Sequence, residues 1–283
     1  MPTLLHELRL AFIALQFLTR VPVPRWVGFE PAWLTACLRH FPLVGAGVGL
    51  IAAAVLWGAL WLWPPTVAAA LSVAATVWLT GAFHEDGLAD TCDGLGGAVS
   101  RERALAIMKD SRIGSYGAVA LVLALVLKVA TVAALTEWSP PSASMALLPP
   151  STSVALLLSA LVWGHAASRA APVVLVWRLP YAGDAEHAKA KPLAMQTDGR
   201  SVAVAIGWLA VLAGGLVALW PALALPLLVS FAAGSVATAL CARWLRRRLG
   251  GFTGDTLGAT QQIVELSLLL AWLASMGWTG GLR

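Results

Sequence analysis

The stretch from residue 41 to residue 63 reads FPLVGAGVGLIAAAVLWGALWLW and contains no charged side chain. A helix of about 20 apolar residues is long enough to cross a hydrocarbon core about 30 Å thick. Similar stretches recur along the chain of 283 residues, of which 59% are hydrophobic and only 12% are charged. Soluble domains usually carry about 25% charged residues. The composition therefore excludes an ordinary soluble protein and indicates a polytopic helical membrane protein.

The apolar stretches predict an all-α fold, a polytopic membrane helix bundle formed by residues 1–283 as a single integral membrane domain. An earlier segment, residues 8–18, is too short to span a bilayer and is typical of an interfacial or re-entrant amphipathic helix. About seven transmembrane helices are expected, at 41–63, 66–83, 114–136, 154–177, 201–220, 222–245 and 262–278.

Connections that contain lysine and arginine alternate with connections that contain neither. Four precede the first predicted span, four lie in each of the connections around 79–113, 178–200 and 243–248, and the intervening connections have none. The positive-inside rule then places the N-terminus and these basic segments in the cytoplasm, at the cell (inner) membrane. The basic residues thus report orientation in a lipid bilayer, and we expect no nucleic-acid partner. Most carboxylates lie in these same segments. This favours an enzyme that acts at the cytoplasmic face over a transporter, whose substrate-binding residues would lie near the middle of the bilayer.

An acidic motif, HEDGLADTCDGLGG at 84–97, directly follows the second predicted span. On a helix Asp86, Asp90 and Asp93 stand at positions i, i+4 and i+7 and share one face. Like charges at this spacing repel unless a cation bridges them, and carboxylate oxygens select Mg²⁺, Mn²⁺ or Ca²⁺. The alternative is a solvated acidic helix start, although four glycines make a poor surface helix. We therefore expect a divalent-cation site in this motif.

Two further segments carry candidate phosphate-binding groups. In IMKDSRIGSYG, 107–117, Lys109 and Arg112 could hold phosphate oxygens, and Asp110 or Ser111 could cap the next helix. The alternative is a basic anchor beside the membrane. Together with the acidic motif this loop forms a predicted cytoplasmic unit, residues 84–113.

The other segment, GGFTGDTLGA at 250–259, leads into the last predicted span. A glycine-rich loop that opens a helix offers free backbone N–H groups to an anion. Gly251, Thr253 and Gly254 are the candidate contacts. Asp255 is either a further metal ligand or a simple N-cap.

Charged residues inside predicted spans form the last group of candidates. Glu265 lies a turn or two into the last span, where a carboxylate is a functional candidate, and we expect it to orient a catalytic group or to pair with Arg169. Lys128 also falls inside a span and must snorkel, pair or line a wet cavity. His165 lies four residues before Arg169, and a structural role is equally compatible with its position. Carboxylates, phosphate-binding cations and a cytoplasmic mouth together favour transfer of a phosphoryl-linked group.

Five motifs follow one another in an order that resembles a known family. They are FLTRVPVP at 17–24, FPLVG at 41–45, the acidic motif at 85–97, KDSRIG at 109–114 and GGFTGDTLGA at 250–259. Over almost the full chain the sequence is similar to the cobalamin synthase family, also called adenosylcobinamide-GDP ribazoletransferase or cobalamin-5′-phosphate synthase. Family members usually carry Leu at the position of Glu85 and often Ala at that of Cys92, and this departure leaves the three aspartates intact.

The resemblance implies a Mg²⁺-dependent enzyme of the last stage of adenosylcobalamin assembly, with adenosylcobinamide-GDP and α-ribazole, or its 5′-phosphate, as partners and GMP as a product. Asp86, Asp90 and Asp93, with Asp255, would hold the metal on the diphosphate. A carboxylate of the acidic motif or Glu265 would deprotonate the ribazole hydroxyl. The groups that would bind the substrate are Lys109, Asp110, Ser111, Arg112, Gly251, Thr253 and Gly254.

Two alternatives stay open at this point. The acidic spacing is also similar to that of CDP-alcohol phosphotransferases, which show Ala-Arg where this chain has Leu88-Ala89-Asp90. A metal-ion or corrinoid transporter is the alternative from a different class. The sequence allows a homo-oligomer, because two sets of glycines suit close helix contacts. These are Gly45, Gly47 and Gly49, and Gly207, Gly214 and Gly215.

Overall fold

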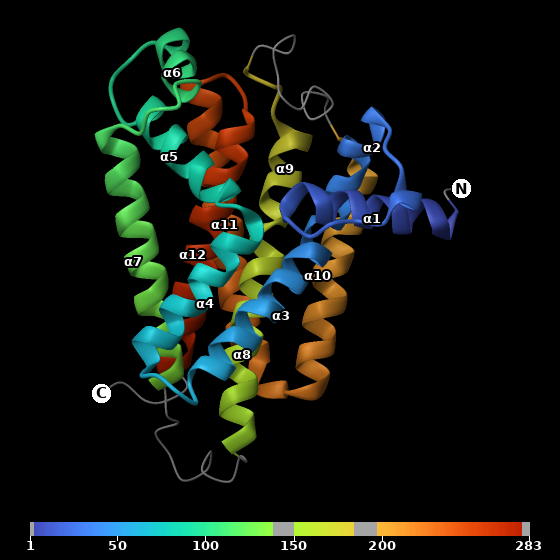
Figure 1. Cartoon of the computed structure of the whole chain (residues 1–283), viewed down its shortest axis with the longest axis vertical. Helices are drawn as coiled ribbons and strands as arrows, with labels where there is room; N and C mark the ends of the chain where they lie inside the picture. Colours follow the sequence, from blue (N-terminus) through green and yellow to red (C-terminus); the bar gives the residue numbers. More distant parts are fainter. Residues whose placement is uncertain (1–2, 138–149, 184–196, 279–283) are drawn as a thin grey trace.

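A computed structural model describes residues 3–137, 150–183 and 197–278, the side chains of 137, 150–156 and 278 excepted (Figure 1). The described chain is helical and has no strand, apart from an isolated bridge between Tyr181 and Phe252. The predicted all-α class is therefore confirmed. The helices are α1 (Leu4–Leu18), α2 (Pro31–Ala36), α3 (Phe41–Ala59), α4 (Pro65–Thr80), α5 (Phe83–Leu95), α6 (Arg101–Met108), α7 (Ser115–Glu137), α8 (Pro150–Ser168), α9 (Ala170–Arg178), α10 (Gly199–Leu219), α11 (Ala224–Arg248) and α12 (Gly254–Trp278), with short 3₁₀ turns η1 (Arg25–Val27), η2 (Cys37–His40) and η4 (Pro221–Leu223).

Five helical stretches of the described chain are long and apolar enough to cross a membrane, and a sixth results if α4 and α5 form one bent span. The predicted number of about seven stays a prediction. The expected fourth span, 154–177, is made by α8 and α9, which meet at a turn at Arg169. The five stretches are Pro31–Ala59, Ser115–Thr136, Gly199–Leu219, Pro221–Arg248 and Gly254–Gly277.

A sharp bend separates α4 from α5, whose axes differ by 89°. Gly81, with φ of +70°, ends α4 in a Schellman motif: its N–H donates to Trp78 O and that of Ala82 donates to Val77 O. Ala82 has φ of +59°, which is uncommon for a residue with a side chain. The expected second span, 66–83, therefore ends at the bend, and α5 leaves it in a new direction that carries the acidic motif.

The amphipathic helix expected at 8–18 is α1, which begins earlier, at Leu4. Figure 1 shows α1 lying across the bundle instead of along it. Its inner face buries Leu10, Ile13 and Leu18, while Leu4 and Leu8 are exposed. This arrangement suits a helix at an interface.

Glycines allow α3 and α8 to pack closely against each other. A Cβ added at Gly45 would overlap the backbone oxygen of His165, and one added at Gly49 would lie 2.6 Å from Val162 Cα. These two glycines therefore serve contacts within the chain. Gly47, like Gly207, Gly214 and Gly215, faces open space within 4 Å, so the predicted homo-oligomer stays untested.

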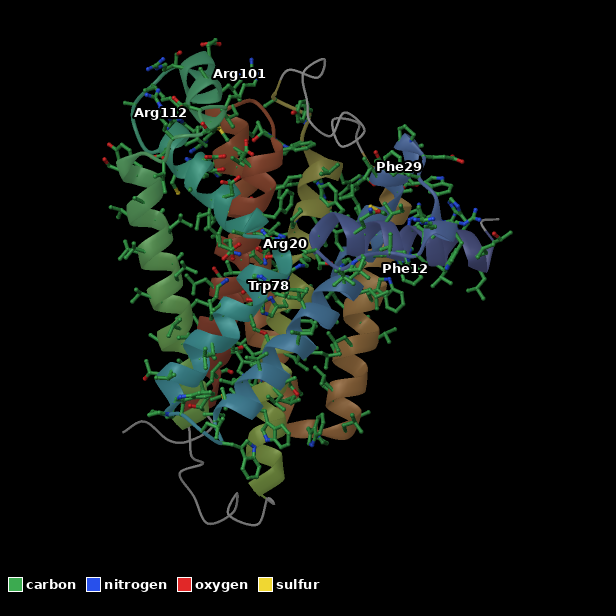
Figure 2. The ribbon with its side chains drawn as sticks, viewed as in Figure 1. Phe12, Arg20, Phe29, Trp78, Arg101 and Arg112 are labelled. Atoms are coloured by element: carbon green, nitrogen blue, oxygen red, sulfur yellow. The ribbon has the colours of Figure 1, made fainter. Side chains whose placement is uncertain are left out.

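Three of the four basic segments gather at one end of the bundle, whereas Arg20 of the first lies beside the bend at Gly81 (Figure 2). Arg101 at the start of α6 donates to Ala182 O at 3.0 Å, and Figure 2 shows Arg101 at the end where α5 and α6 lie. Arg248 at the end of α11 donates to Leu95 O at 3.1 Å and to Gly97 O at 2.8 Å. The alternation of basic and uncharged connections in the sequence is thus reflected in a basic end of the fold.

Candidate active site

The three aspartates of the acidic motif lie on α5, as the sequence predicts. Asp86 is exposed, and Asp90 and Asp93 are half-buried. Their i, i+4 and i+7 spacing places them on one helical face. Residues 83–95 form a continuous helix, and the alternative of a solvated acidic helix start stays open for the exposed Asp86.

The start of α12 crosses α5 at a contact between glycines. A Cβ added at Gly87 would lie 2.6 Å from the backbone oxygen of Asp255, and one added at Gly258 would lie 3.4 Å from Gly87 Cα. Asp255 therefore stands next to the acidic helix, although far from it in sequence. The predicted grouping of Asp255 with the acidic motif agrees with this packing.

Asp93 has a second set of contacts, with the start of α7. One carboxylate oxygen accepts the N–H of Gly114 at 2.7 Å, and the other accepts the N–H of Gly117 at 2.8 Å. These donors belong to the first turn of α7, which has no intrahelical partners for them. Asp93 thus caps α7 from the side and joins the acidic motif to the predicted phosphate-binding loop.

The residues of this junction suit Mg²⁺ in their chemistry. Carboxylate oxygens are the hard ligands it prefers, and it is usually held by one or two of them together with substrate phosphates and water. Asp86 is exposed and Asp90 half-buried on α5, and the start of α12 with Asp255 packs against Gly87 between them. Within the described part of the chain, no three His, Cys, Asp or Glu side chains are already grouped as a metal site.

The predicted phosphate-binding loop is held by its own ion pair. Arg112 donates through Nη2 to Asp110 Oδ2 at 2.7 Å and through Nε to Asp110 Oδ1 at 3.0 Å. These hydrogen bonds from Arg112 lower the pKa of the Asp110 carboxyl to about 2. The Arg112 side chain is 87% exposed, and Lys109 and Ser111 are also exposed. Asp110 accepts the backbone N–H of Arg112 at 3.1 Å, so it shapes the loop as well.

The glycine-rich loop before α12 is partly used for packing. A Cβ at Gly251 would overlap the backbone oxygen of Pro180, and the N–H of Phe252 donates to the same oxygen at 3.0 Å. Thr253 is buried and exchanges hydrogen bonds with Thr256, whose N–H donates to the Thr253 hydroxyl at 3.3 Å. Thr253 is therefore the N-cap of α12. Gly254 is exposed with open space around it, so it is the accessible member of the three predicted contacts.

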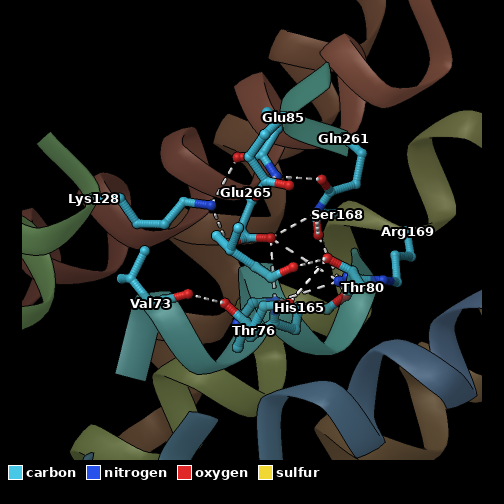
Figure 3. A network of polar contacts seen from close by, with 12 residues as sticks. Val73, Thr76, Thr80, Glu85, Lys128, His165, Ser168, Arg169, Gln261 and Glu265 are labelled. Carbon is cyan, nitrogen blue, oxygen red and sulfur yellow. Dashed lines mark hydrogen bonds and ion pairs between the residues drawn. The ribbon is translucent and has the colours of Figure 1, made fainter. Parts of the chain in front are cut away.

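Glu265 lies in a buried polar cluster in the centre of the bundle (Figure 3). Its side chain is 2% exposed, and Oε1 lies 2.8 Å from Lys128 Nζ. Oε2 lies 3.2 Å from His165 Nδ1 and 4.0 Å from an Nη atom of Arg169. The predicted pairing with Arg169 is thus present at the outer limit of an ion pair, and Lys128 is the closer cation. Burial of these charges is tolerated because they compensate one another.

Glutamines extend this cluster toward α5. Gln261 Nε2 donates to Glu265 Oε2 at 2.6 Å and to Ser168 Oγ at 3.0 Å. Gln262 accepts from Lys128 Nζ at 2.8 Å and donates to Glu85 Oε1 at 3.0 Å. Sequence reasoning missed both glutamines, although two adjacent amides inside an apolar span are a signal that could have identified them.

Glu85 therefore has a structural place despite its departure from the usual family residue. It is buried in the first turn of α5, where it accepts from Gln262. Glu265 and Asp255 are ten residues apart on α12, or about 15 Å along the helix. The structure thus packs the start of α12, with Asp255, against the acidic helix and places Glu265 further along α12, where Gln262 connects it to Glu85 through Lys128.

Comparison with known proteins gives a consistent result over nearly the whole chain. Residues 10–273 match the family described as cobalamin-5-phosphate synthase. An adenosylcobinamide-GDP ribazoletransferase of Leptothrix cholodnii is 57% identical over 278 residues, covering 98% of this chain and 99% of that protein. Proteins of the same name from Polaromonas naphthalenivorans and Shewanella amazonensis are 46% and 43% identical, covering 96% and 97% of this chain and all of their own. No solved structure matches.

Proposed function

The chain belongs to the cobalamin-5-phosphate synthase family, and we propose that it joins α-ribazole, or its 5′-phosphate, to adenosylcobinamide-GDP with release of GMP. The support is the identity of up to 57%, over nearly full length, to proteins named adenosylcobinamide-GDP ribazoletransferase. Nothing in these comparisons supports the alternatives of a CDP-alcohol phosphotransferase or a transporter.

One structural observation carries the assignment of the reaction centre: the contact of Gly87 with the start of α12. Because these backbones approach so closely, we place the carboxylates of Asp86 and Asp90 on one surface with Asp255. A surface of this kind at the basic end of the bundle suits a substrate whose reactive part is a diphosphate. We place the reaction there, on the cytoplasmic side of the inner membrane by the positive-inside rule.

The proposed cofactor is Mg²⁺, held by Asp86, Asp90 and Asp255 together with substrate phosphates. When bound, it would neutralise the diphosphate and stabilise the negative charge on the departing GMP. Asp93 stays a candidate fourth ligand through its remaining lone pairs, since each of its oxygens accepts one hydrogen bond from α7. Its first role in this proposal is to hold α7 and the 109–114 loop beside the other aspartates.

The reaction is a substitution at phosphorus. A ribose hydroxyl of α-ribazole that is also free in its 5′-phosphate forms a bond through its oxygen to the phosphorus nearer the cobinamide. The bond from that phosphorus to the bridging oxygen breaks, and GMP leaves with the electron pair. The hydroxyl proton passes to a carboxylate of the junction. Asp86 is the candidate for this role because it is the exposed member of the set.

Glu265 was the other candidate base, and its surroundings favour a different role. Its two oxygens face Lys128, His165 and Gln261 in the interior. A carboxylate engaged in this way has little access to a substrate hydroxyl. We therefore propose Glu265 as a positioning residue, which holds α7, α8 and α12 together beneath the reaction centre.

Phosphate recognition is assigned to the loop at 109–112 and to the open start of α12. Lys109 and Arg112 are exposed at the basic end of the bundle, near the carboxylates through the Asp93 contact with Gly114. The paired Asp110 keeps the Arg112 guanidinium oriented. Gly254, with open space around it, offers the N-terminus of α12 to an anion.

The experiment that tests this proposal uses the purified full chain in detergent or lipid nanodiscs. It is incubated with adenosylcobinamide-GDP and α-ribazole, with Mg²⁺ or with a chelator. We expect GMP and the joined corrinoid product in equal amounts, and neither when the metal is chelated. Release of CMP from a CDP-alcohol, or flux of a corrinoid across vesicles without nucleotide release, would instead support one of the alternatives.

A further inference from the structure

A large groove lies outside the proposed reaction centre. It has a volume of about 760 Å³ and is lined by α8, α9, α10, α11 and α12. No lining residue comes from α5, from the 109–114 loop or from the first turns of α12. Its volume falls in the range typical of pockets that bind small molecules, about 300–1,000 Å³.

The walls of the groove are mostly apolar. Leu209 of α10 and Val264 and Leu268 of α12 line it, together with the exposed Ile206 and Phe231. Small residues of α11, including Ala239, keep the groove from being filled. An apolar surface of this kind on α10 and α11 suits hydrocarbon better than a water-soluble ligand.

Four arginines stand at one end of the groove: Arg178 at the end of α9 and Arg243, Arg246 and Arg247 at the end of α11. All four are exposed, and none forms an ion pair with a carboxylate of the described chain. The contacts seen are Arg178 stacked on Trp177 at 4.4 Å and Arg246 donating to Arg178 O at 3.4 Å. Four like charges so close to one another repel unless an anion lies among them.

This combination of cations at one end and hydrocarbon walls along the rest matches an anionic amphiphile. We propose that the groove binds an anionic phospholipid, with its phosphate among the four arginines and an acyl chain along α10 and α11. Guanidinium groups bind phosphate oxygens in bidentate fashion. Basic pockets between transmembrane helices on the cytoplasmic side suit anionic headgroups, and this end carries the other basic segments of the fold.

The test measures lipid binding to the full chain without any substrate, so that it is independent of the proposed reaction. Purified protein in detergent is titrated with phosphatidylglycerol or with phosphatidylcholine of the same acyl chains, and bound lipid is counted by native mass spectrometry. We expect phosphatidylglycerol to bind at least tenfold more tightly. Changing any one of Arg243, Arg246 and Arg247 to Gln should lower the preference for phosphatidylglycerol over phosphatidylcholine about fivefold.

Matched variants separate the groove from general charge and bulk effects. Arg103→Gln removes an exposed arginine on α6 outside the groove and should leave the lipid preference unchanged. Ala239→Trp places a large ring in the groove and should reduce binding of both lipids. Val236→Trp adds the same ring to an exposed position of α11 that does not line the groove, and binding should persist.

Three results would overturn the proposal. The first is equal binding of the two phospholipids to the unaltered chain. The second is a preference for phosphatidylglycerol that survives neutralisation of the three α11 arginines. The third is displacement of phosphatidylglycerol by millimolar α-ribazole 5′-phosphate or inorganic phosphate, which would assign the arginines to a soluble anion.

Discussion

The carboxylate of Asp93 on α5 accepts the backbone N–H of Gly114 at 2.7 Å, at the start of α7. Its second oxygen accepts the N–H of Gly117 at 2.8 Å, and a Cβ at either glycine would overlap Asp93. The acidic motif and the loop that precedes α7 are therefore held in one relative position. This contact gives Asp93 of the acidic motif and the two glycines of the 107–117 segment a shared structural role.

We expect Asp93→Ala to lower stability before it affects metal binding. Two hydrogen bonds to a charged acceptor would be lost at the N-terminus of α7, a loss of about 1–3 kcal/mol in the free energy of unfolding. Thermal unfolding of the purified full chain measures the change, with Asp86→Ala as the control because Asp86 is exposed. Equal melting temperatures for the two variants would contradict the capping role.

Asp90→Asn should instead remove activity with little change in stability. Asparagine keeps the size of the side chain but is a weaker ligand for Mg²⁺, so GMP release should fall by about 100-fold or more. The measurement is turnover across a Mg²⁺ titration, together with the melting temperature. Full turnover at saturating Mg²⁺ would remove Asp90 from the proposed metal site, and Asp255→Asn gives the corresponding test on α12.

Gly87→Ala tests the approach of α5 to α12. The added Cβ would lie 2.6 Å from the Asp255 backbone oxygen, so the helices must separate and activity should fall. Gly47→Ala is the matched control, since it is a helical glycine with open space, and should raise stability by about 0.5–1 kcal/mol. Undiminished turnover in Gly87→Ala would show that the reaction does not depend on this contact.

The buried pair of Lys128 and Glu265 should behave as a structural unit. Removing one partner, in Lys128→Met or Glu265→Gln, leaves a buried charge uncompensated and should cost about 3–5 kcal/mol. The double variant should recover part of that loss, and a double-mutant cycle on thermal or denaturant unfolding measures the coupling. If Glu265→Gln kept its stability but shifted the pH profile of turnover, Glu265 would be acting as the base.

The pair of Asp110 and Arg112 should be insensitive to pH in the working range. The pKa of Asp110 is lowered from its ordinary value of 3.8 to about 2, so its contribution is fully present above the ordinary value and is lost only as pH falls through about 2. We therefore expect Asp110→Asn to leave the pH profile of turnover unchanged between about pH 5 and pH 9. A shift of the acidic limb in this variant would contradict that expectation.

Arg112→Ala should raise the KM for adenosylcobinamide-GDP without changing the melting temperature. The side chain is 87% exposed, so its removal costs little packing. Steady-state kinetics with Arg112→Lys as the conservative comparison separates charge from bidentate geometry. An unchanged KM in Arg112→Ala would leave Arg112 only the role of a basic anchor beside the membrane.

Much of the architecture was accessible from periodicity and composition. Long apolar runs predict membrane helices because backbone polar groups in hydrocarbon must bond within the segment. The i, i+4, i+7 spacing of Asp86, Asp90 and Asp93 predicts one helical face, and α5 is helical over the whole motif. The sequence predicted substrate contacts at Gly251 and Thr253 less reliably. Glycines and threonines at helix starts also pack against other segments or cap the helix, as these two do, and need not bind an anion.

Local patterns thus specified the helices, their basic end and the residue types of the proposed reaction centre, since these depend on neighbours a few residues apart. Contacts between distant segments came only from packing in three dimensions. The crossing of Gly87 with α12 and the burial of Glu265 beside Lys128 both join segments that lie far apart in the sequence. The physical reason is that close packing and charge compensation depend on which side chains are neighbours in space. The path of the whole chain decides these neighbours.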